Sequence, residues 1–202
     1  MRKTGSEIRL SVGERIFNLV LSSLLIALVV ISARLNLVIG AIPITMQTLA
    51  VILTGLLLGP RTGWSVPALY LLMGLIGFPV FSGGGGIGYL FKPTFGFLLG
   101  FIPAAYLAGF FYHRKWFKQD FLNVISGSLV GMVVIYLFGF GYIPFASFLF
   151  GSELAVLAAI LPGLPLMICG DLLKIACLTM VVPVLTRELE KARQPFKNRA
   201  TE

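Results

Sequence analysis

The run from Ala155 to Leu185 is almost entirely apolar and contains two charged side chains, Asp171 and Lys174. A helical run of this length can cross a bilayer, which needs about 20 apolar residues. Each charge placed alone at the bilayer centre costs about 2.5 to 3.5 kcal/mol on insertion scales. The three-residue spacing places both side chains on one helix face, close enough to pair. The pair is either a self-neutralising link between helices or a polar ligand site, and we favour the ligand site because ionisable residues inside membranes generally mark function.

The whole chain has the composition of a polytopic membrane protein. Hydrophobic residues make up 57% and charged residues 12% of its 202 residues, whereas soluble domains carry about 25% charged residues. We therefore expect an all-α fold, with one integral membrane domain over residues 1–202, a cytoplasmic leader at 1–14 and a cytoplasmic basic tail at 188–202. The first apolar run lacks a clear small-residue cleavage site, so it is interpreted as a retained helix rather than a signal peptide.

Six transmembrane helices are expected from the apolar runs and the turns that separate them. Glycines four residues apart, at Gly96 and Gly100 and again at Gly127 and Gly131, predict close helix packing. A short loop is expected at 34–42, an aromatic-rich connection at 141–151 and a short interfacial helix at 152–160. The six expected helices cover approximately residues 15–33, 43–58, 64–77, 94–112, 121–140 and 162–187.

The basic residues predict the orientation of the chain. The net charge is +8, but the charges lie in short connecting segments, which indicates the positive-inside rule rather than a nucleic-acid partner. One side of the membrane receives only Arg34 and Lys92. Both termini are therefore expected in the cytoplasm, with Asp171 within about two helical turns of the outer face. The basic residues expected on the cytoplasmic side are Arg2, Lys3, Arg9, Arg15, Arg61, Arg114, Lys115, Lys118, Arg187, Lys191, Arg193, Lys197 and Arg199.

A glycine-rich segment between Phe78 and Tyr89 reads FPVFSGGGGIGY. Four consecutive glycines cannot form a stable helix, and their backbone can approach another group closely. A phosphate-binding loop is excluded, because Tyr89 and Leu90 stand where that motif needs Lys and Ser or Thr. The apolar side chains of the segment must rest on something. We favour a lid lying over a pocket, with a plain re-entrant turn as the alternative.

Two further features concern possible contacts. Gln47 is an uncharged donor and acceptor near the membrane entry of the second expected helix, where it is either solvated or directed at a ligand. Ser23 and Ala27 form a small-xxx-small spacing in the first helix, which lets another helix approach closely. Packing within the chain and docking of a partner protein explain this spacing about equally well.

Neither a disulfide nor a metal site is expected. Cys169 and Cys177 are eight residues apart on one expected helix, which separates them by roughly 12 Å along its axis, too far for a disulfide. His113 is the sole histidine and lies among basic residues. It is interpreted as a surface residue, because no second histidine is present to complete a metal site.

Five short motifs occur in order along the chain and together resemble one family. They are similar to the BioY family, the biotin-binding S components of energy-coupling factor (ECF) vitamin importers, over about residues 15–187. The chain departs from the family pattern at Ile42, at Phe95 and at Ser23. The motifs that carry the resemblance are Pro43-Ile-Thr-Met-Gln-Thr48, Leu58-Gly-Pro60, Gly77-Phe-Pro-Val-Phe81 with the glycine run, Pro93-Thr94 and Asp171-Leu-Leu-Lys174.

The resemblance implies a function without catalysis. Family members have six membrane helices in the prokaryotic plasma membrane, bind biotin near the outer face, and dock on a T subunit that works with two ATPase subunits. Biotin is the transported ligand and not a cofactor, and Ser23 and Ala27 are the expected docking residues. The expected biotin-binding residues are Thr45, Gln47, Phe81, Ser82, Gly83, Gly84, Tyr89, Thr94, Asp171 and Lys174.

The chemistry of biotin suits these residues independently. Its ureido group offers two N–H donors and a carbonyl acceptor, and its tail ends in a carboxylate. An ionised Asp171 accepts from N–H groups, and Lys174 donates to carbonyl or carboxylate oxygens. Two alternatives stay open: a proton-coupled secondary transporter in which Asp171 carries the proton, and a membrane scaffold in which the pair is structural. The lysine disfavours the first because it stabilises the charged carboxylate.

Overall fold

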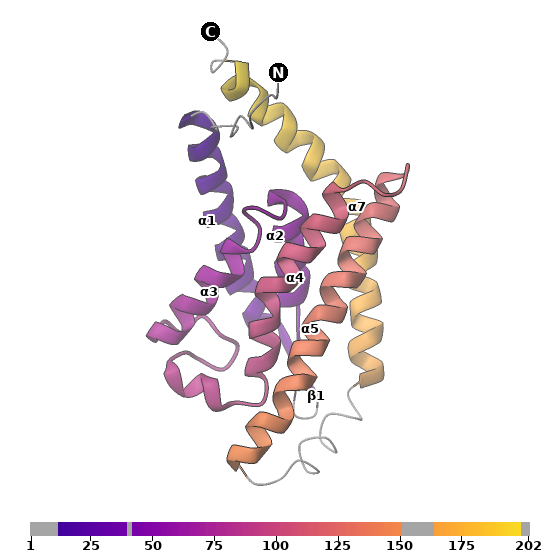
Figure 1. Cartoon of the computed structure of the whole chain (residues 1–202). Helices are drawn as coiled ribbons and strands as arrows, with labels where there is room; N and C mark the ends of the chain where they lie inside the picture. Colours follow the sequence, from indigo (N-terminus) through magenta and orange to yellow (C-terminus); the bar gives the residue numbers. More distant parts are fainter. Residues whose placement is uncertain (1–11, 40–41, 151–163, 199–202) are drawn as a thin grey trace, which may run out of the picture.

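The computed structural model describes residues 12–39, 42–150 and 164–198 (Figure 1). Apart from one short hairpin, the described elements are helices, so the prediction of an all-helical membrane protein is confirmed at that level. In chain order they are α1 (Val12–Arg34), β1 (Asn36–Ile39), β2 (Ile42–Thr45), α2 (Gln47–Leu58), α3 (Ser65–Ile76), the 3-10 helix η1 (Ile87–Phe91), α4 (Phe95–His113), α5 (Asp120–Phe150) and α7 (Leu164–Asn198).

Four described helices, α1, α4, α5 and α7, are long and apolar enough to cross a bilayer. The helices α2 and α3 have 12 residues each, which corresponds to a rise of about 18 Å, short of the hydrocarbon core of about 30 Å. Because of its four long apolar helices, the chain is a multi-pass membrane protein. The expected interfacial helix at 152–160 and the expected start of the last helix at 162 lie outside the described residues.

Small residues let the central helices approach closely. A Cβ added to Gly55 of α2 would lie 2.0 Å from the carbonyl oxygen of Ala105 in α4. Gly96 of α4 is equally tight against the Tyr142 side chain of α5, and Gly127 of α5 lies on the backbone of Ala108. The predicted close packing at the glycine spacings is thus confirmed, and α4 and α5 form an antiparallel pair at the centre of the bundle (Figure 1).

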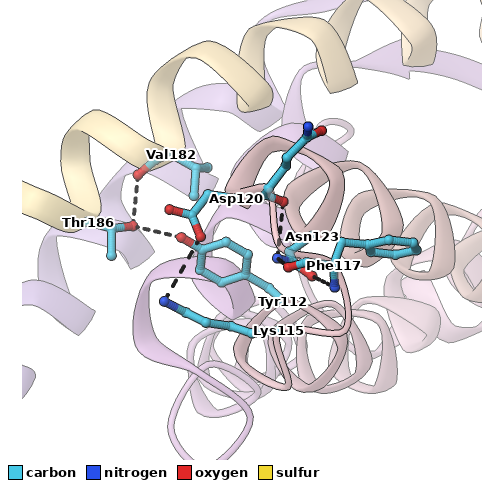
Figure 2. A network of polar contacts seen from close by, with 8 residues as sticks. Tyr112, Lys115, Phe117, Asp120, Asn123, Val182 and Thr186 are labelled. Carbon is cyan, nitrogen blue, oxygen red and sulfur yellow. Dashed lines mark hydrogen bonds and ion pairs between the residues drawn. The ribbon is translucent and has the colours of Figure 1, made fainter.

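The turn between α4 and α5 is closed by the buried side chain of Asn123 (Figure 2). Its Oδ1 accepts from the backbone N–H of Phe117 at 3.0 Å, and its Nδ2 donates to the carbonyl of the same residue at 2.8 Å. Beside this turn the hydroxyl groups of Tyr112 on α4 and Thr186 on α7 are 3.4 Å apart. These contacts join α4, α5 and α7 at one end of the bundle.

Three expected boundaries were wrong. The second helix does not begin at residue 43, and residues 34–42 are not simply a loop, because Ile42–Thr45 pairs antiparallel with Asn36–Ile39. The β-branched residues here favour strands. Among the described residues this sheet has two strands, so Pro43 occupies an edge where its missing N–H is tolerated. The fifth helix does not end at residue 140: the apolar run continues and α5 extends to Phe150. The last helix passes 187 and continues to Asn198.

The extension of α7 is held against the beginning of α1. The rings of Phe17 and Phe196 are 6.2 Å apart, and the Arg193 guanidinium donates to Asn18 Oδ1 at 2.8 Å. Tertiary contacts therefore stabilise a helix where the sequence predicted a tail. The first residues of α1 and the last residues of α7 lie at one end of the bundle, and the hairpin and the glycine segment lie toward the other (Figure 1).

Candidate functional site

Asp171 and Lys174 lie on the second and third turns of the described part of α7 and form an ion pair. Lys174 Nζ is 2.9 Å from Asp171 Oδ1. Only 8% of Asp171 and 5% of Lys174 are exposed. The prediction that the three-residue spacing places both groups on one face, within pairing distance, is confirmed. Two charges buried to this extent are costly unless further hydrogen bonds satisfy them.

Two other helices supply those hydrogen bonds. Lys174 Nζ also donates to Thr48 Oγ1 of α2 at 2.9 Å. The hydroxyl group of Tyr136 on α5 donates to Asp171 Oδ2. Each carboxylate oxygen thus has a donor, and two of the three ammonium protons of Lys174 have an acceptor. The result is a polar chain of four residues that joins α2, α5 and α7 within an otherwise apolar bundle.

These groups open onto a pocket with about 610 Å³ of empty space, including the part open to solvent. Apolar and aromatic side chains make up much of the wall, and polar groups enter from several elements. The lining residues are Thr45, Gln47, Thr48, Ser82, Tyr89, Thr94, Phe97, Leu98, Phe101, Ile135, Tyr136, Met167, Asp171 and Lys174.

Most of the residues expected from the sequence come together here. The hairpin supplies Thr45, the first turn of α2 supplies Gln47, and η1 supplies Tyr89. Ser82, just before the run of glycines, and Thr94, which precedes α4, complete this polar set with the ion pair. Segments that are up to about 130 residues apart in the sequence therefore meet at one pocket, as polar recognition of a small ligand requires.

Three expected residues are not part of the lining. Phe81 is fully buried, with its ring between those of Tyr70 and Tyr89 at centroid distances of 5.4 and 4.6 Å. It acts as an anchor for the glycine segment. Gly84 has a φ of 111° with open space at its Cβ position, and a Cβ on Gly83 would lie 3.5 Å from the Tyr89 hydroxyl group.

The glycine segment lies against α3. The N–H of Gly86 donates to the carbonyl of Gly74 at 2.7 Å, and a Cβ on Gly74 would overlap the Phe81 ring. The Tyr70 hydroxyl group donates to the carbonyl of Val80 at 3.1 Å. The expectation that this apolar segment rests on the protein is confirmed, and its end at Tyr89 borders the pocket.

Gln47 carries an unsatisfied donor at the pocket wall. The Gln47 residue is 3% exposed, and its Nε2 makes no hydrogen bond of ordinary geometry to any described residue, although its side chain lies close enough to the Tyr70 hydroxyl group to act on that group. A buried amide without a partner costs about 1 to 3 kcal/mol. An acceptor on a bound ligand would remove that cost.

Sequence reasoning missed half of the lining. The apolar lining residues lie at helical spacings that are equally typical of a hydrophobic core. No sequence signal therefore distinguishes a core position from a position in the pocket wall. Thr48 and Tyr136 had a weak signal, since each is a polar residue in an apolar helix. The unanticipated lining residues are Thr48, Phe97, Leu98, Phe101, Ile135, Tyr136 and Met167.

The other singled-out residues lie away from the pocket. Ser23 and Ala27 are both exposed on α1. Cys169 and Cys177 are both exposed and not joined in a disulfide. Within residues 12–39, 42–150 and 164–198 no group of three or more metal-ligating side chains occurs.

Comparisons with known proteins place the chain among transporters of one kind. A family model described as "BioY family" matches residues 4–191. The chain is 37% identical over 146 residues to a "Probable biotin transporter BioY" of Pyrococcus horikoshii, a match that covers 71% of this chain and 85% of that protein. It is also 37% identical over 121 residues to a protein of the same name from Lysinibacillus sphaericus, covering 59% of this chain and 60% of that protein.

A solved structure has the same fold. It is the crystal structure of the S-component for biotin from an ECF-type ABC transporter, which matches with a TM-score of 0.76. The two chains are 25% identical, and the match covers 88% of this chain and 94% of the other.

Proposed function

The chain belongs to the BioY family, and we propose that it is the substrate-binding membrane subunit, or S component, of an ECF-type importer, with biotin as its ligand. It is a transport protein and not an enzyme. The proposal unites the family membership with a pocket whose wall carries a buried ion pair. The related proteins are named biotin transporters, and the similar solved structure is an S-component for biotin.

The observation that carries the proposal is the combination of groups in the pocket wall. The buried Asp171–Lys174 pair and the unsatisfied Nε2 of Gln47 both line it. A ureido group has N–H donors for a carboxylate and a carbonyl acceptor for an ammonium or amide N–H. The walls formed by Phe97 and Phe101 suit the apolar rings and aliphatic tail of biotin.

We assign ligand contacts to the polar residues of the lining that the sequence had indicated. These are Thr45, Gln47, Ser82, Tyr89, Thr94, Asp171 and Lys174. We assign Phe81, Gly83 and Gly84 a supporting role in the segment that borders the pocket. The segment is proposed as a lid, because Ser82 and Tyr89 line the pocket while Gly84 and Gly86 have the left-handed backbone that glycine adopts without strain.

For the topology we propose six membrane-embedded helices with both termini in the cytoplasm of the prokaryotic cell membrane. The α4–α5 turn carries Arg114, Lys115 and Lys118, and lies at the same end as the last turns of α7 (Figure 1). Arg34 and Lys92 lie toward the opposite end, so the asymmetry follows the positive-inside rule. The pocket is then near the outer face, and α2 and α3 are embedded without spanning the full core alone.

Transport against a gradient needs an energy source from other subunits. The glycine segment lacks the lysine and hydroxyl residue of a nucleotide-binding loop. We propose that a T subunit with two ATPase subunits supplies this energy, and that it docks on the α1 face carrying Ser23 and Ala27. Both residues are exposed, and small residues allow another helix to approach closely.

Two rival functions fit the site less well. A proton-coupled carrier needs a carboxylate that protonates readily, but both oxygens of Asp171 already accept hydrogen bonds, one of them from the Lys174 ammonium. A scaffold would need the ion pair only to hold helices together. It would leave the pocket and the unsatisfied amide of Gln47 without a role.

Ligand-dependent stabilisation tests the proposal. Biotin should raise the melting temperature of the purified protein in detergent, because a ligand that binds only the folded state stabilises it by mass action, by about 2.7 kcal/mol at a hundred times Kd. Riboflavin and thiamine serve as vitamin controls and should leave it unchanged. Equal shifts with all three, or no shift with biotin, would overturn the assignment.

A further inference from the structure

Tyr136 contacts the ion pair from a different helix. It lies on α5, lines the pocket, and donates its hydroxyl hydrogen to Oδ2 of Asp171 on α7. Its ring is stacked on Phe140 at 5.8 Å and meets Phe97 edge-on at 6.4 Å. Phe97 and Phe140 also contact each other at 5.7 Å. The aromatic side chains thus fix the position of the tyrosine ring, and with it the direction of the hydroxyl group.

Each charged group is held by its partner on α7 and by one residue of another helix. Lys174 is fixed from two sides, because it donates to Thr48 as well as to Asp171. The carboxylate of Asp171 has one donor on its own helix, at Oδ1, and one from another helix, at Oδ2. Without the Tyr136 hydroxyl group, Oδ2 has no donor among the described residues. The carboxylate can then rotate about its terminal bond, a torsion with broad preferences.

We propose that Tyr136 is a positioning residue of the ligand site: its hydroxyl group fixes the carboxylate of Asp171 in the orientation in which the carboxylate accepts an N–H donor from the ligand. This inference rests on the proposed function. A carboxylate oxygen accepts more than one hydrogen bond, so Oδ2 keeps acceptor capacity while the tyrosine holds it. The site then selects ligands that bring a neutral N–H group to Asp171, as a ureido ring does.

Removal of the hydroxyl group alone tests the proposal. Tyr136→Phe keeps the ring that packs on Phe97 and Phe140 and removes only the hydrogen bond. Biotin binding, measured by calorimetry in detergent, should weaken at least about tenfold, as expected for one hydrogen bond to a charged group. In an Asp171→Asn background the same change should have little further effect, because the group that Tyr136 positions is already altered.

A matched control exists at the other end of the bundle. Tyr112 on α4 also directs its hydroxyl group at a residue of α7, Thr186, at 3.4 Å (Figure 2). Tyr112→Phe removes a hydroxyl contact to the same helix far from the pocket and should leave biotin affinity unchanged. An equal loss in this control would show that Tyr136→Phe acts through the general packing of α7 and would overturn the proposal.

Infrared spectroscopy reports on the Asp171 carboxylate directly. This test therefore does not require a measurement of weak biotin binding by the Asp171→Asn variant. The chain contains two aspartates, Asp120 and Asp171. In an Asp120→Asn background, ¹³C-labelled aspartate reports Asp171 alone. Tyr136→Phe should shift the carboxylate stretching band of the ligand-free protein.

The outcomes separate the two proposals. Failure of the unmodified protein to bind biotin overturns the proposed function. Normal biotin binding with either an unshifted carboxylate band or unchanged affinity in Tyr136→Phe overturns the positioning role and leaves the proposed function intact. If Tyr136→Phe weakens biotin binding equally in the unmodified protein and in the Asp171→Asn background, the positioning role is also overturned, because Tyr136 would then act without the Asp171 carboxylate.

Discussion

Removal of the ion pair, one partner at a time and then together, separates its structural role from the role in ligand binding that we propose for it. The changes are Asp171→Asn and Lys174→Met, singly and combined. Breaking a buried pair typically costs about 3 to 5 kcal/mol of stability, because the remaining charge has lost its counter-ion. Here each survivor keeps one partner: Lys174 retains Thr48, and Asp171 retains Tyr136. We therefore expect losses near the lower end, about 3 kcal/mol for each single variant.

The double variant removes both charges and should regain much of the stability. Asn at position 171 can still accept from the hydroxyl group of Tyr136, and Thr48 loses one hydrogen bond, worth about 1 kcal/mol. Biotin affinity should not recover with the fold. Each charge-assisted hydrogen bond to the ligand contributes about 1.5 to 3 kcal/mol, so the folded double variant should bind at least about a hundredfold more weakly.

Thermal unfolding and calorimetry on the same detergent samples measure both quantities. A matched control pair lies on the same helix with the same spacing: Lys191 and Glu188 are 2.7 Å apart but exposed. Neutralising that pair should change stability by less than about 1 kcal/mol and leave biotin affinity unaltered. Near-native biotin affinity in the folded Asp171→Asn, Lys174→Met variant would refute the reasoning, because the pair would then only hold helices together.

Three further predictions concern surfaces and glycines. Ala27→Trp on the exposed face of α1 should block assembly with the T subunit in a pull-down experiment while biotin binding survives; loss of both would show that this face belongs to the internal core. Gly85→Val would place a Cβ 2.1 Å from a backbone carbonyl oxygen and should speed biotin dissociation in stopped-flow measurements. Gly88→Ala has open space around its Cβ and should leave the dissociation rate unchanged. Identical dissociation rates in the two variants would show that the glycine segment is a passive connection. Gly55→Ala should lower stability by about 1 to 3 kcal/mol through overpacking, since its Cβ would lie 2.0 Å from a carbonyl oxygen of α4. The Cβ added in Gly141→Ala meets nothing within 4 Å, so this control should leave the melting temperature unchanged or raise it.

Local pattern accounts for what could be predicted about the elements. Apolar runs with few charges mark membrane helices, and the cores of α1, α3, α4 and α7 lie where those runs predicted. Boundaries were less accurate because they depend on contacts between elements. α5 continues through Gly141, a residue with low helix propensity, because the helix packs against α4, and Gly96 makes room there for Tyr142.

The hairpin was missed for a related reason. A proline before an apolar run is a common helix start, so the sequence favoured a helix from Pro43. The strand pairing of Ile42–Thr45 with Asn36–Ile39 depends on a neighbour that a helix-start signal does not include. The hairpin affects the candidate site directly, since it places Thr45 at the pocket and lets α2 begin at Gln47.

The sequence by itself determined the membrane class, the helical fold and the charged pair of the candidate site. Asp171 and Lys174 stand out in an apolar run because burial of charge in a bilayer has a large free-energy cost, and their helical spacing implied the pair. Only the tertiary structure decided which side chains surround that centre. Thr48 and Tyr136 reach the pair from α2 and α5, and contacts between helices have no fixed spacing along the chain. Hydrogen bonds within one helix follow from its period, whereas those between helices follow from packing.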